Sequence, residues 1–378
     1  MLQKDSKCFC GMDLHSNNTV IAVLDETGKK IFNGKLHNKM AAILKALHPF
    51  KDSICGIVVE STYNWYWLVD GLMENDYKVH LAHPAANHQY KGLKHTNDTN
   101  DAFWLAELLR LGILKEGYIF PKEERHLRDL ARKRLKLVNN RTQYILSFKS
   151  LVNRNLGVNI DSNNIKKLTE AKVNPMFKND HLILTGRENI AMMRFLDKRI
   201  KQLKKEILKA AALKPEFLKL KTAPGIGDIL ALTISFETGN INRFEDAGNY
   251  VSYSRCVSSK RTSNNKSKGE NNRKNGNKYL AWAYVEAAHK MKCFCNAAKR
   301  YYTKKSKKTK PVVASKALAA KIARACYFIM KDQVDFDETK IFGKPINSNN
   351  KDKGCGSKPE RGLDKEPCAP IGNTATAA

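Results

Sequence analysis

The chain has 378 residues, of which 42% are apolar, and a formal net charge of +30 from 67 Lys and Arg against 37 Asp and Glu. This length predicts two or three domains, and the apolar fraction excludes wholesale disorder. The charge indicates a polyanionic partner, either nucleic acid or a membrane surface. No apolar run approaches the roughly 18–20 residues that span a bilayer, and the first residues lack the apolar core of a signal peptide. We therefore expect a cytoplasmic protein that binds nucleic acid and no membrane.

Short apolar, β-branched segments alternate with helical ones in the first third of the chain. Strands are predicted at 7–13, 18–25, about 30–36, 54–60 and 78–82. Helices are predicted at 39–48, 64–75 and 98–113. The run at 54–60 is continuously apolar, which is typical of a buried central strand. This order predicts an α/β domain with a mixed sheet over residues 1–118.

The middle of the chain, residues 119–215, is dense in Lys and Arg and has helical periodicity at 123–155 and 187–213. Apolar residues of the second segment recur every three or four positions, as in a coiled coil: Ile190, Met193, Leu196, Ile200, Leu203 and Ile207. We predict a long helical hairpin that links two domains. A spacer is the simplest role, and dimerisation is a second one.

Residues 216–335 are predicted to form a mostly α-helical C-terminal domain. Its helices are expected at 228–236, 279–300 and 311–331, with a basic polar loop at 255–278. From residue 336 the composition turns to Asn, Lys, Gly, Ser and Pro, which predicts a disordered tail over 336–378.

The nine cysteines include two Cys-x-Cys pairs, Cys8 with Cys10 and Cys293 with Cys295. Zinc sites more often use Cys-x-x-Cys with a second pair or with histidines. We therefore expect free thiols in a reducing cytoplasm and no zinc site.

Four acidic residues lie at the ends of predicted strands or at the start of a predicted helix, where a carboxylate calls for a structural or functional explanation. Asp13 ends the first apolar strand and Glu60 ends the buried run, while Asp98 and Asp101 share one face at the start of a helix. Ligands gather at the strand ends of an α/β sheet, so these four side chains can converge. An all-oxygen cluster suits Mg²⁺ or Mn²⁺. Two such ions about 4 Å apart can clamp the attacking and leaving oxygens of a phosphodiester.

Three of the four carboxylates also have an ordinary structural explanation, and Glu60 is the exception. Asp98 can cap the helix, Asp101 can favour the helix dipole, and Asp13 can form a turn. Glu60 is harder to explain, because a charge at the end of a buried strand is costly unless it is paired or bound to metal.

Two motifs in the second half suggest contact with phosphate. Gly225 and Gly227, in APGIGD (223–228), resemble a helix-hairpin-helix turn whose backbone N–H groups approach a phosphate, although a plain turn fits equally well. The loop 255–278 holds eight Lys or Arg and one acid, which indicates a loop that contacts nucleic acid. Its candidate contacts are Lys260, Arg261, Lys266, Lys268, Arg273 and Lys274.

Together these stretches resemble the DEDD transposases of bacterial insertion sequences, a family described as bridge-RNA-guided recombinases. The resemblance is carried by GMDLH (11–15), VVES (58–61), KHTNDTNDAFWLAELLR (94–110) and KTAPGIGDILALTI (221–234). It implies a ribonuclease-H-like fold of the RuvC type for the N-terminal domain. It also implies that Asp13, Glu60, Asp98 and Asp101 are the family's catalytic, metal-binding set.

The resemblance further implies a serine nucleophile in the basic loop. The family phrase runs roughly Ser-Gly-Gly-Lys, a basic stretch, then Lys-x-Gly-Asn-x-x-Leu. Counting back from the second part places Ser263 and Lys266 on the first, with Asn264 and Asn265 in place of the glycines. Asn tolerates a left-handed backbone better than most residues, so the turn can survive. Ser267 and Ser259 are the alternative nucleophiles, and Ser258 also lies in this loop.

The expected function is that of an insertion-sequence transposase, a DNA recombinase that uses Mg²⁺ and a phosphoserine intermediate. The resemblance implies donor and target DNA, a guide RNA and a homo-oligomer, either dimer or tetramer, as partners. The runner-up is a metal-dependent RuvC-like nuclease or Holliday-junction resolvase that uses water. A third possibility is a nucleic-acid-binding protein without catalysis.

Overall fold

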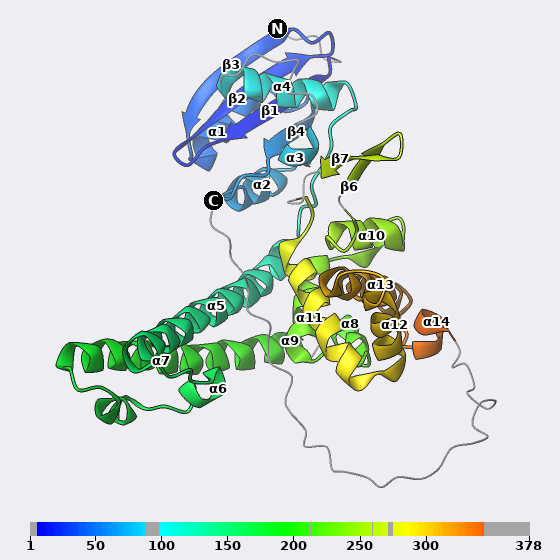
Figure 1. The fold of residues 1–378 in the computed structure, drawn as a ribbon. Helices are drawn as coiled ribbons and strands as arrows, with labels where there is room; N and C mark the ends of the chain where they lie inside the picture. The colour runs from blue at the N-terminus through cyan, green and yellow to red at the C-terminus, as the bar shows by residue number, and fades with distance from the viewer. Residues whose placement is uncertain (1–5, 88–97, 212–213, 259, 271–274, 344–378) are drawn as a thin grey trace.

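The computed structural model describes residues 6–87, 98–211, 214–258, 260–270 and 275–343. Figure 1 shows three parts: an N-terminal unit built on a sheet, a long helical hairpin that projects to one side, and a helical unit. Across these residues, no helix combines the length and the apolar character needed to cross a membrane.

The sheet contains five strands in the order β3-β2-β1-β4-β5. They are β1 (Cys8–Leu14), β2 (Asn18–Asp25), β3 (Lys30–His37), β4 (Ile54–Glu60) and β5 (Val79–Ala82). The first three strands pair antiparallel, whereas β4 pairs parallel to β1 and β5 pairs parallel to β4. The predicted mixed sheet is confirmed, and its arrangement is consistent with a ribonuclease-H-like fold.

Helices cover both faces of the sheet because side chains alternate along each strand. On one face α1 (Met40–Leu47) and α2 (Tyr66–Met73) pack over a core that includes Met12 and Ile57. On the other face α4 (Asp98–Arg110) packs over β1 and β2. A short helix, α3 (Pro84–Asn87), follows β5.

Two long helices form the projecting hairpin (Figure 1). They are α5 (Lys122–Leu156) and α7 (Asp180–Ala211), which pack along each other. Of the predicted seam, all but Leu203 is buried. The hairpin has a separate core, built around Phe148 and shared with α6 (Ser162–Ile165), η3 (Glu170–Lys172) and η4 (Asn174–Met176).

The helical unit surrounds a core with three buried tyrosines, Tyr250, Tyr284 and Tyr327. The hydroxyls of Tyr250 and Tyr284 lie 2.6 Å apart. Burial raises the pKa of both phenols, so they stay neutral and exchange hydrogen bonds. The helices are α8 (Pro215–Leu220), α9 (Asp228–Thr238), α10 (Ala247–Tyr253), α11 (Lys278–Phe294), α12 (Asn296–Ser306), α13 (Pro311–Asp332) and α14 (Glu338–Phe342).

Three predictions for this unit need correction. The helix expected at 279–300 is two helices, because Cys295 has an extended backbone and its Sγ accepts a hydrogen bond from the Ala298 N–H, capping α12. The loop expected at 255–278 contains two strands, β6 (Lys260–Ser263) and β7 (Lys266–Glu270).

The third correction concerns the tail, because α14 lies inside the segment expected to be disordered. Its Ile341 carbonyl accepts a hydrogen bond from Lys321 Nζ at 3.0 Å, and Phe342 packs on Tyr301. The remainder of the predicted tail, 344–378, lies outside the described residues.

One face of α5 joins the sheet unit to the helical unit. We call Arg125, Arg128 and Arg132, spaced by three and four residues, the arginine face. Toward the sheet unit, Arg125 binds the Asp70 carboxylate of α2 through two nitrogens, at 2.6 and 3.0 Å. Its guanidinium also lies 4.8 Å from the centre of the Trp65 ring. Such planar, two-point contacts hold a fixed orientation.

The other two arginines bind Glu237 of α9, whose carboxylate is buried. Arg132 donates to both oxygens, at 2.6 and 2.8 Å, and Arg128 donates at 3.1 Å. Asn277, at the start of α11, donates a fourth hydrogen bond at 2.7 Å. Burial would raise the pKa of Glu237, but the hydrogen bond from Arg132 and the charges of both arginines outweigh it and lower the pKa. We call these four residues the Glu237 cluster.

Removal of the Glu237 carboxylate should destabilise the helical unit strongly. Glu237→Ala leaves two arginines without their buried counter-charge, for an expected loss of about 3–5 kcal/mol in the free energy of unfolding. Denaturant titration followed by tryptophan fluorescence measures this loss. The matched control is Glu74→Ala, which removes an exposed ion pair with Lys122 and should cost less than about 1 kcal/mol. Equal losses in the two variants would contradict the role of the cluster.

The same cluster predicts a pH dependence. Because the folded-state pKa of Glu237 lies below its ordinary value of 4.5, its contribution is complete above pH 4.5 and is lost as the pH falls through the lowered pKa. The stability difference between wild type and Glu237→Gln should therefore be constant from about pH 7 to 5 and shrink at lower pH. Unfolding curves measured down to about pH 3 test this, and a constant difference throughout would exclude it.

Candidate active site

Two of the predicted carboxylates stand side by side at one edge of the sheet. β1 and β4 are parallel, and Met12 pairs with Val59. The next residue on each strand is Asp13 and Glu60 respectively. Because parallel strands end at the same edge, the two acidic residues occupy neighbouring positions there.

Both residues also lie on the face of the sheet that α4 covers. Met12 and Val59 belong to the core under α1 and α2, on the opposite face. Since side chains alternate along a strand, Asp13 and Glu60 share the α4 side with Gly11 and Val58. Asp13 is nearly buried, with 6% of its surface exposed, and Glu60 is half-buried.

The register of α4 on β4 places Asp101 at this edge. Leu109 lies against Gly56, and Leu105 packs with Val58. Four residues of a helix and two residues of a strand advance by about 6 Å each. Continuing by one step therefore directs the Asp101 end of α4 toward the edge where β4 ends at Glu60.

The same argument places the beginning of α4 beside Asp13. A Cβ atom added at Gly11 would lie 2.0 Å from the Ala102 carbonyl oxygen and 2.7 Å from the Ala106 nitrogen, so α4 rests directly on β1. One turn before Ala102 lies Asp98, which begins α4. The side chain of Asp98 is outside the described part of the structure, as are residues 94–97 of the signature stretch.

His15 is a member of this edge that the sequence analysis did not single out. Its Nε2 lies 3.2 Å from Asp13 Oδ2, which is an ion pair when the imidazole is protonated. The His15 carbonyl accepts hydrogen bonds from the side-chain amides of Asn38 and Asn64, both at 3.0 Å. Its spacing of two residues from Asp13 could have indicated this position, because side chains two residues apart along a strand lie on the same face.

The donor chemistry at this edge fits a hard divalent cation, because the candidate ligands are carboxylate oxygens. Asp13 comes from β1, Glu60 from β4, and Asp98 and Asp101 from α4. Within the described ranges, no three or more His, Cys, Asp and Glu side chains form a cluster that could hold a metal ion. The described ranges include Asp13, His15, Glu60 and Asp101, so these four side chains alone do not form such a cluster, and the Asp98 side chain lies outside them.

The predicted nucleophile lies on the β6–β7 hairpin. Ser263 ends β6, Lys266 begins β7, and the two are paired across the hairpin. Between them Asn264 and Asn265 have φ angles of 50° and 59°, both left-handed, which is the pattern of a type I′ turn. The expectation that Asn264 and Asn265 can adopt a left-handed turn is confirmed.

Ser263 is exposed at the tip of the hairpin, and so are Arg261, Lys266 and Lys268. Figure 1 shows the hairpin extending away from α10 as an arm. The serine and the carboxylates therefore belong to separate units of the chain. Ser259, Arg273 and Lys274 lie outside the described residues, as do the side chains of Lys260 and Ser267.

The base of this hairpin loop is closed by residues around Gly276. Arg255 donates two hydrogen bonds to the Gly276 carbonyl, at 3.0 and 2.8 Å. The Asn277 N–H donates to the Tyr253 carbonyl at 2.6 Å, and its side chain caps α11 by accepting from Tyr279 and Leu280. Gly276 has a φ of 85°, and a Cβ there would meet the Tyr253 carbonyl oxygen at 2.4 Å. The positive φ of Gly276 and the cap made by Asn277 thus explain this Gly-Asn dipeptide in structural terms.

The glycines of APGIGD have different surroundings. Gly225 has a φ of 87° and lies against the backbone of α11, where a Cβ would be 2.6 Å from the Met291 nitrogen. Gly227 has open space around its Cβ position and precedes α9. The first residue of α9, Asp228, already places a carboxylate there, with Lys221 Nζ at 3.0 Å. These contacts give Gly225 a packing role and leave Gly227 as the open position.

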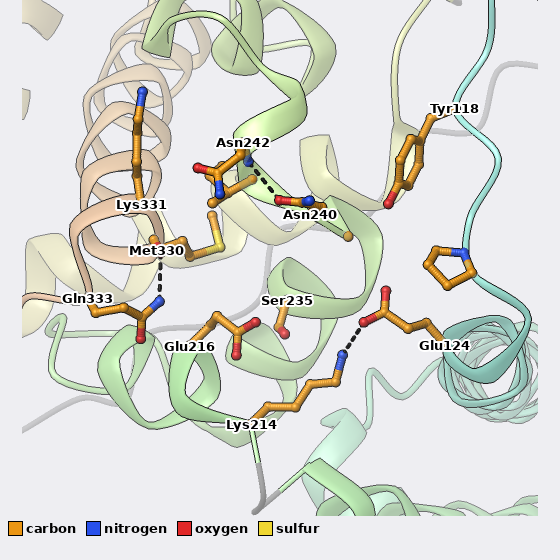
Figure 2. A pocket seen from close by; sticks show the side chains of 13 residues that line it. Tyr118, Glu124, Lys214, Glu216, Ser235, Asn240, Asn242, Met330, Lys331 and Gln333 are labelled. Carbon is orange, nitrogen blue, oxygen red and sulfur yellow. Dashed lines mark hydrogen bonds and ion pairs between the residues drawn. The ribbon is translucent and has the colours of Figure 1, made fainter.

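A cavity of about 530 Å³ lies away from both candidate catalytic elements. Figure 2 shows that its wall includes Glu124 of α5 and Lys214, whose Nζ and the carboxylate lie 2.7 Å apart, and Gln333 after α13. None of the predicted site residues lines it. We assign it no part in catalysis.

A ribonuclease-H-like sheet with acidic residues at its carboxyl edge, joined to a basic helical unit, defines a class of enzyme that transfers phosphoryl groups on nucleic acid. Residues 10–155 match the family model of the DEDD transposases of the IS110 type, described as Transposase, and residues 218–303 match the model described as Transposase IS116/IS110/IS902 family. Together the two matches cover more than half of the chain. The chain therefore belongs to the IS110-type DEDD transposases, which cleave and rejoin DNA, and the family indicated by its motifs is confirmed. Domains of this type typically use a divalent metal ion. The comparison with curated proteins returned no match.

The contact between Gly11 and α4 provides a direct test of the acidic edge. Gly11→Ala inserts a methyl group against backbone atoms of Ala102 and Ala106, so α4 and Asp101 must shift away from the sheet. Because misplacement by about 1 Å can cost 100-fold in rate, we expect a loss of about that size in DNA strand cleavage. Gly117→Ala is the control, since its Cβ would meet no heavy atom closer than 3.5 Å. Wild-type cleavage by a folded Gly11→Ala protein would rule out this placement of α4.

Proposed function

We propose that this transposase cleaves and rejoins DNA through a phosphoserine intermediate. In this proposal Ser263 is the nucleophile, and Asp13, Glu60, Asp98 and Asp101 form the acidic half of the site. The observation that carries the proposal is the register of α4 on β1 and β4, which aligns the start of the helix with the ends of both strands. The proposed domains are 1–118, 119–215 and 216–335, followed by a tail.

The four carboxylates would hold one or two divalent ions, Mg²⁺ or Mn²⁺. A bound ion would supply positive charge to the oxygens of the scissile phosphate. The sheet holds Asp13 and Glu60 rigidly, because their strands are paired on both sides. His15 contributes a hydrogen-bond donor, or a positive charge when protonated, beside Asp13.

The first chemical step joins Ser263 to the DNA. The Ser263 Oγ forms a bond to the scissile phosphorus while the bond from phosphorus to the 3′ oxygen breaks. The serine proton is transferred to the departing 3′ oxygen, which leaves as a hydroxyl, and the 5′ phosphate remains on the serine. Lys266, paired with Ser263 across the hairpin, supports this role because its ammonium can hold a phosphate oxygen.

The second step reverses the first with a different strand. A 3′ hydroxyl attacks the phosphoserine, the bond from phosphorus to Oγ breaks, and the serine recovers its proton. Each step exchanges one phosphodiester for another of similar energy, so no nucleotide triphosphate is consumed. This is covalent catalysis, which divides one difficult exchange into two easier ones.

The proposed assembly is a dimer or tetramer in which the serine of one protomer meets the carboxylates of another. An exposed hairpin on a separate unit supports this arrangement, because a partner can reach it. Donor and target DNA are the substrates. A guide RNA is proposed on the resemblance to bridge-RNA-guided recombinases, and the net charge of +30 suits both nucleic acids.

The nucleophile is tested with purified protein, its element's RNA and a labelled donor DNA. Ser263→Ala should eliminate the covalent protein–DNA adduct seen on a denaturing gel, since alanine has no nucleophile. The neighbouring Thr262→Ala, also exposed on β6, should keep at least about half of the wild-type adduct. Adduct at the wild-type level in Ser263→Ala would transfer the role to Ser267 or Ser259. Cleavage without adduct in the wild type would favour a RuvC-like nuclease or junction resolvase that uses water.

The acidic half is tested on α4 itself. Asp101→Asn should lower strand cleavage by about 100-fold or more, because the proposed ion loses a carboxylate ligand and with it the positive charge that stabilises the transition state. The matched control is Glu107→Gln on the same helix, where the carboxylate pairs with Arg110 at 2.7 Å. That variant should stay within about threefold of wild type. Full activity in Asp101→Asn would remove this residue from the site.

A further inference from the structure

The longest acid-free stretch of the helical unit is also strongly basic. Residues 287–331 contain thirteen Lys and Arg and no Asp or Glu. The highest density is at 299–310, which we call the cationic segment. Its seven cations are Lys299, Arg300, Lys304, Lys305, Lys307, Lys308 and Lys310. It comprises most of α12 and the connection to α13.

All seven cations of this segment are exposed, because α12 packs through other residues. Ala297 and Ala298 are buried, and Tyr301 and Tyr302 are half-buried. Lys321 Nζ lies 5.1 Å from the centre of the Tyr301 ring. The two tyrosines are thus occupied in packing, and the outward surface consists of cations with small hydroxyl residues between them.

Across the described ranges, no ion pair neutralises any of the seven cations. Glu338 of α14 interacts with Cys295, at the other end of α12 from the segment. Residues 344–378 carry six Lys or Arg and four acids, so the chain's own C-terminus does not supply a complementary charge. Like charges at this spacing destabilise a helix by a few tenths of a kcal/mol per pair. A polyanion bound along the segment would remove that repulsion.

We propose that the cationic segment binds the backbone of double-stranded DNA, independently of sequence and apart from the serine hairpin. The choice of DNA as the polyanion rests on the proposed function. α12 has 11 residues and is therefore about 16 Å long, enough to reach phosphates on both sides of a groove about 12 Å wide. Six of the seven cations are lysines, whose ammonium groups act on phosphates as point charges, so we expect contacts that position the duplex without selecting a sequence.

The fold connects this surface to the proposed chemistry. α12 packs on α13, and so does α10, which leads into the β6–β7 hairpin. In Figure 1 the hairpin and α12 lie on different sides of α13. A duplex held along α12 would therefore lie on the same helical unit from which the hairpin extends. The segment thus provides a second DNA contact in addition to that of the serine hairpin.

The test is a binding measurement in EDTA, where no metal-dependent cleavage contributes. The variant K299Q/R300Q/K304Q/K307Q removes four charges from one face of the segment. The control K198Q/K201Q/K205Q/K209Q removes four exposed charges from one face of α7. The probe is a labelled 30-base-pair DNA duplex of scrambled sequence, with a duplex RNA of the same sequence as the second arm. Affinity is measured from about 50 to 200 mM salt, and circular dichroism verifies folding.

We expect the segment variant to lower the magnitude of the slope of log affinity against log salt by about 3–4, since each lost phosphate contact removes about 0.9. Over that salt range wild type should thus lose about 100-fold more affinity than the variant. The control should change the slope by less than about 1. An unchanged slope in the segment variant, an equal loss in the control, or a loss confined to duplex RNA would overturn the proposal. Because no cleavage is measured, a failure of the phosphoserine mechanism would show in adduct assays alone.

Discussion

The buried carboxylate of Glu237 is the contact on which the arrangement of the molecule depends. Arg128 and Arg132 reach it from α5, and Asn277 reaches it from the start of α11. Asn277 also closes the loop that carries the serine hairpin. One turn earlier on α5, Arg125 binds the sheet unit through Asp70. A buried charge is stable only when its partners have good geometry, so these contacts allow little variation in position. Through them α5 holds both the unit that carries the serine hairpin and the sheet unit that carries the acidic edge.

The acidic edge depends on small residues as much as on acidic ones. Gly11 lets α4 lie directly on β1, and Ala102 and Ala106 are the helix residues at that contact. Only this close approach brings the first turn of α4 level with the ends of two parallel strands. The protein thus separates two electrostatic tasks. In the proposed mechanism a positive surface attracts the polyanion from a distance, while a small acidic edge, set in the sheet, holds the ion beside the phosphate that reacts.

The sequence predicted the sheet well, because the apolar runs of β1, β2 and β4 are governed by local alternation and burial. It did not predict the β6–β7 hairpin, which is polar and depends on left-handed asparagines, nor the break at Cys295, which involves neither Gly nor Pro. The positions of Asp13, Glu60 and Asp101 along their elements were predicted, although not their mutual register. The Glu237 cluster could not be anticipated, since Arg132 and Glu237 are 105 residues apart and either could have been a surface charge. His15 and the cationic segment were visible in the sequence, but only burial and neighbours distinguish them from ordinary polar residues.

The hairpin of α5 and α7 is long, and its two ends have different surroundings. α5 alone, at 35 residues, is about 52 Å long. Its base carries the arginine face, whereas its tip is built around Phe148 and encloses a core of its own with α6. The base packs into the core around Tyr250 and the tip into the core around Phe148, so a change in length by whole heptads would keep the buried seam in register and leave the arginine face in place. The length of this hairpin therefore sets how far the tip reaches without altering the position of the acidic edge.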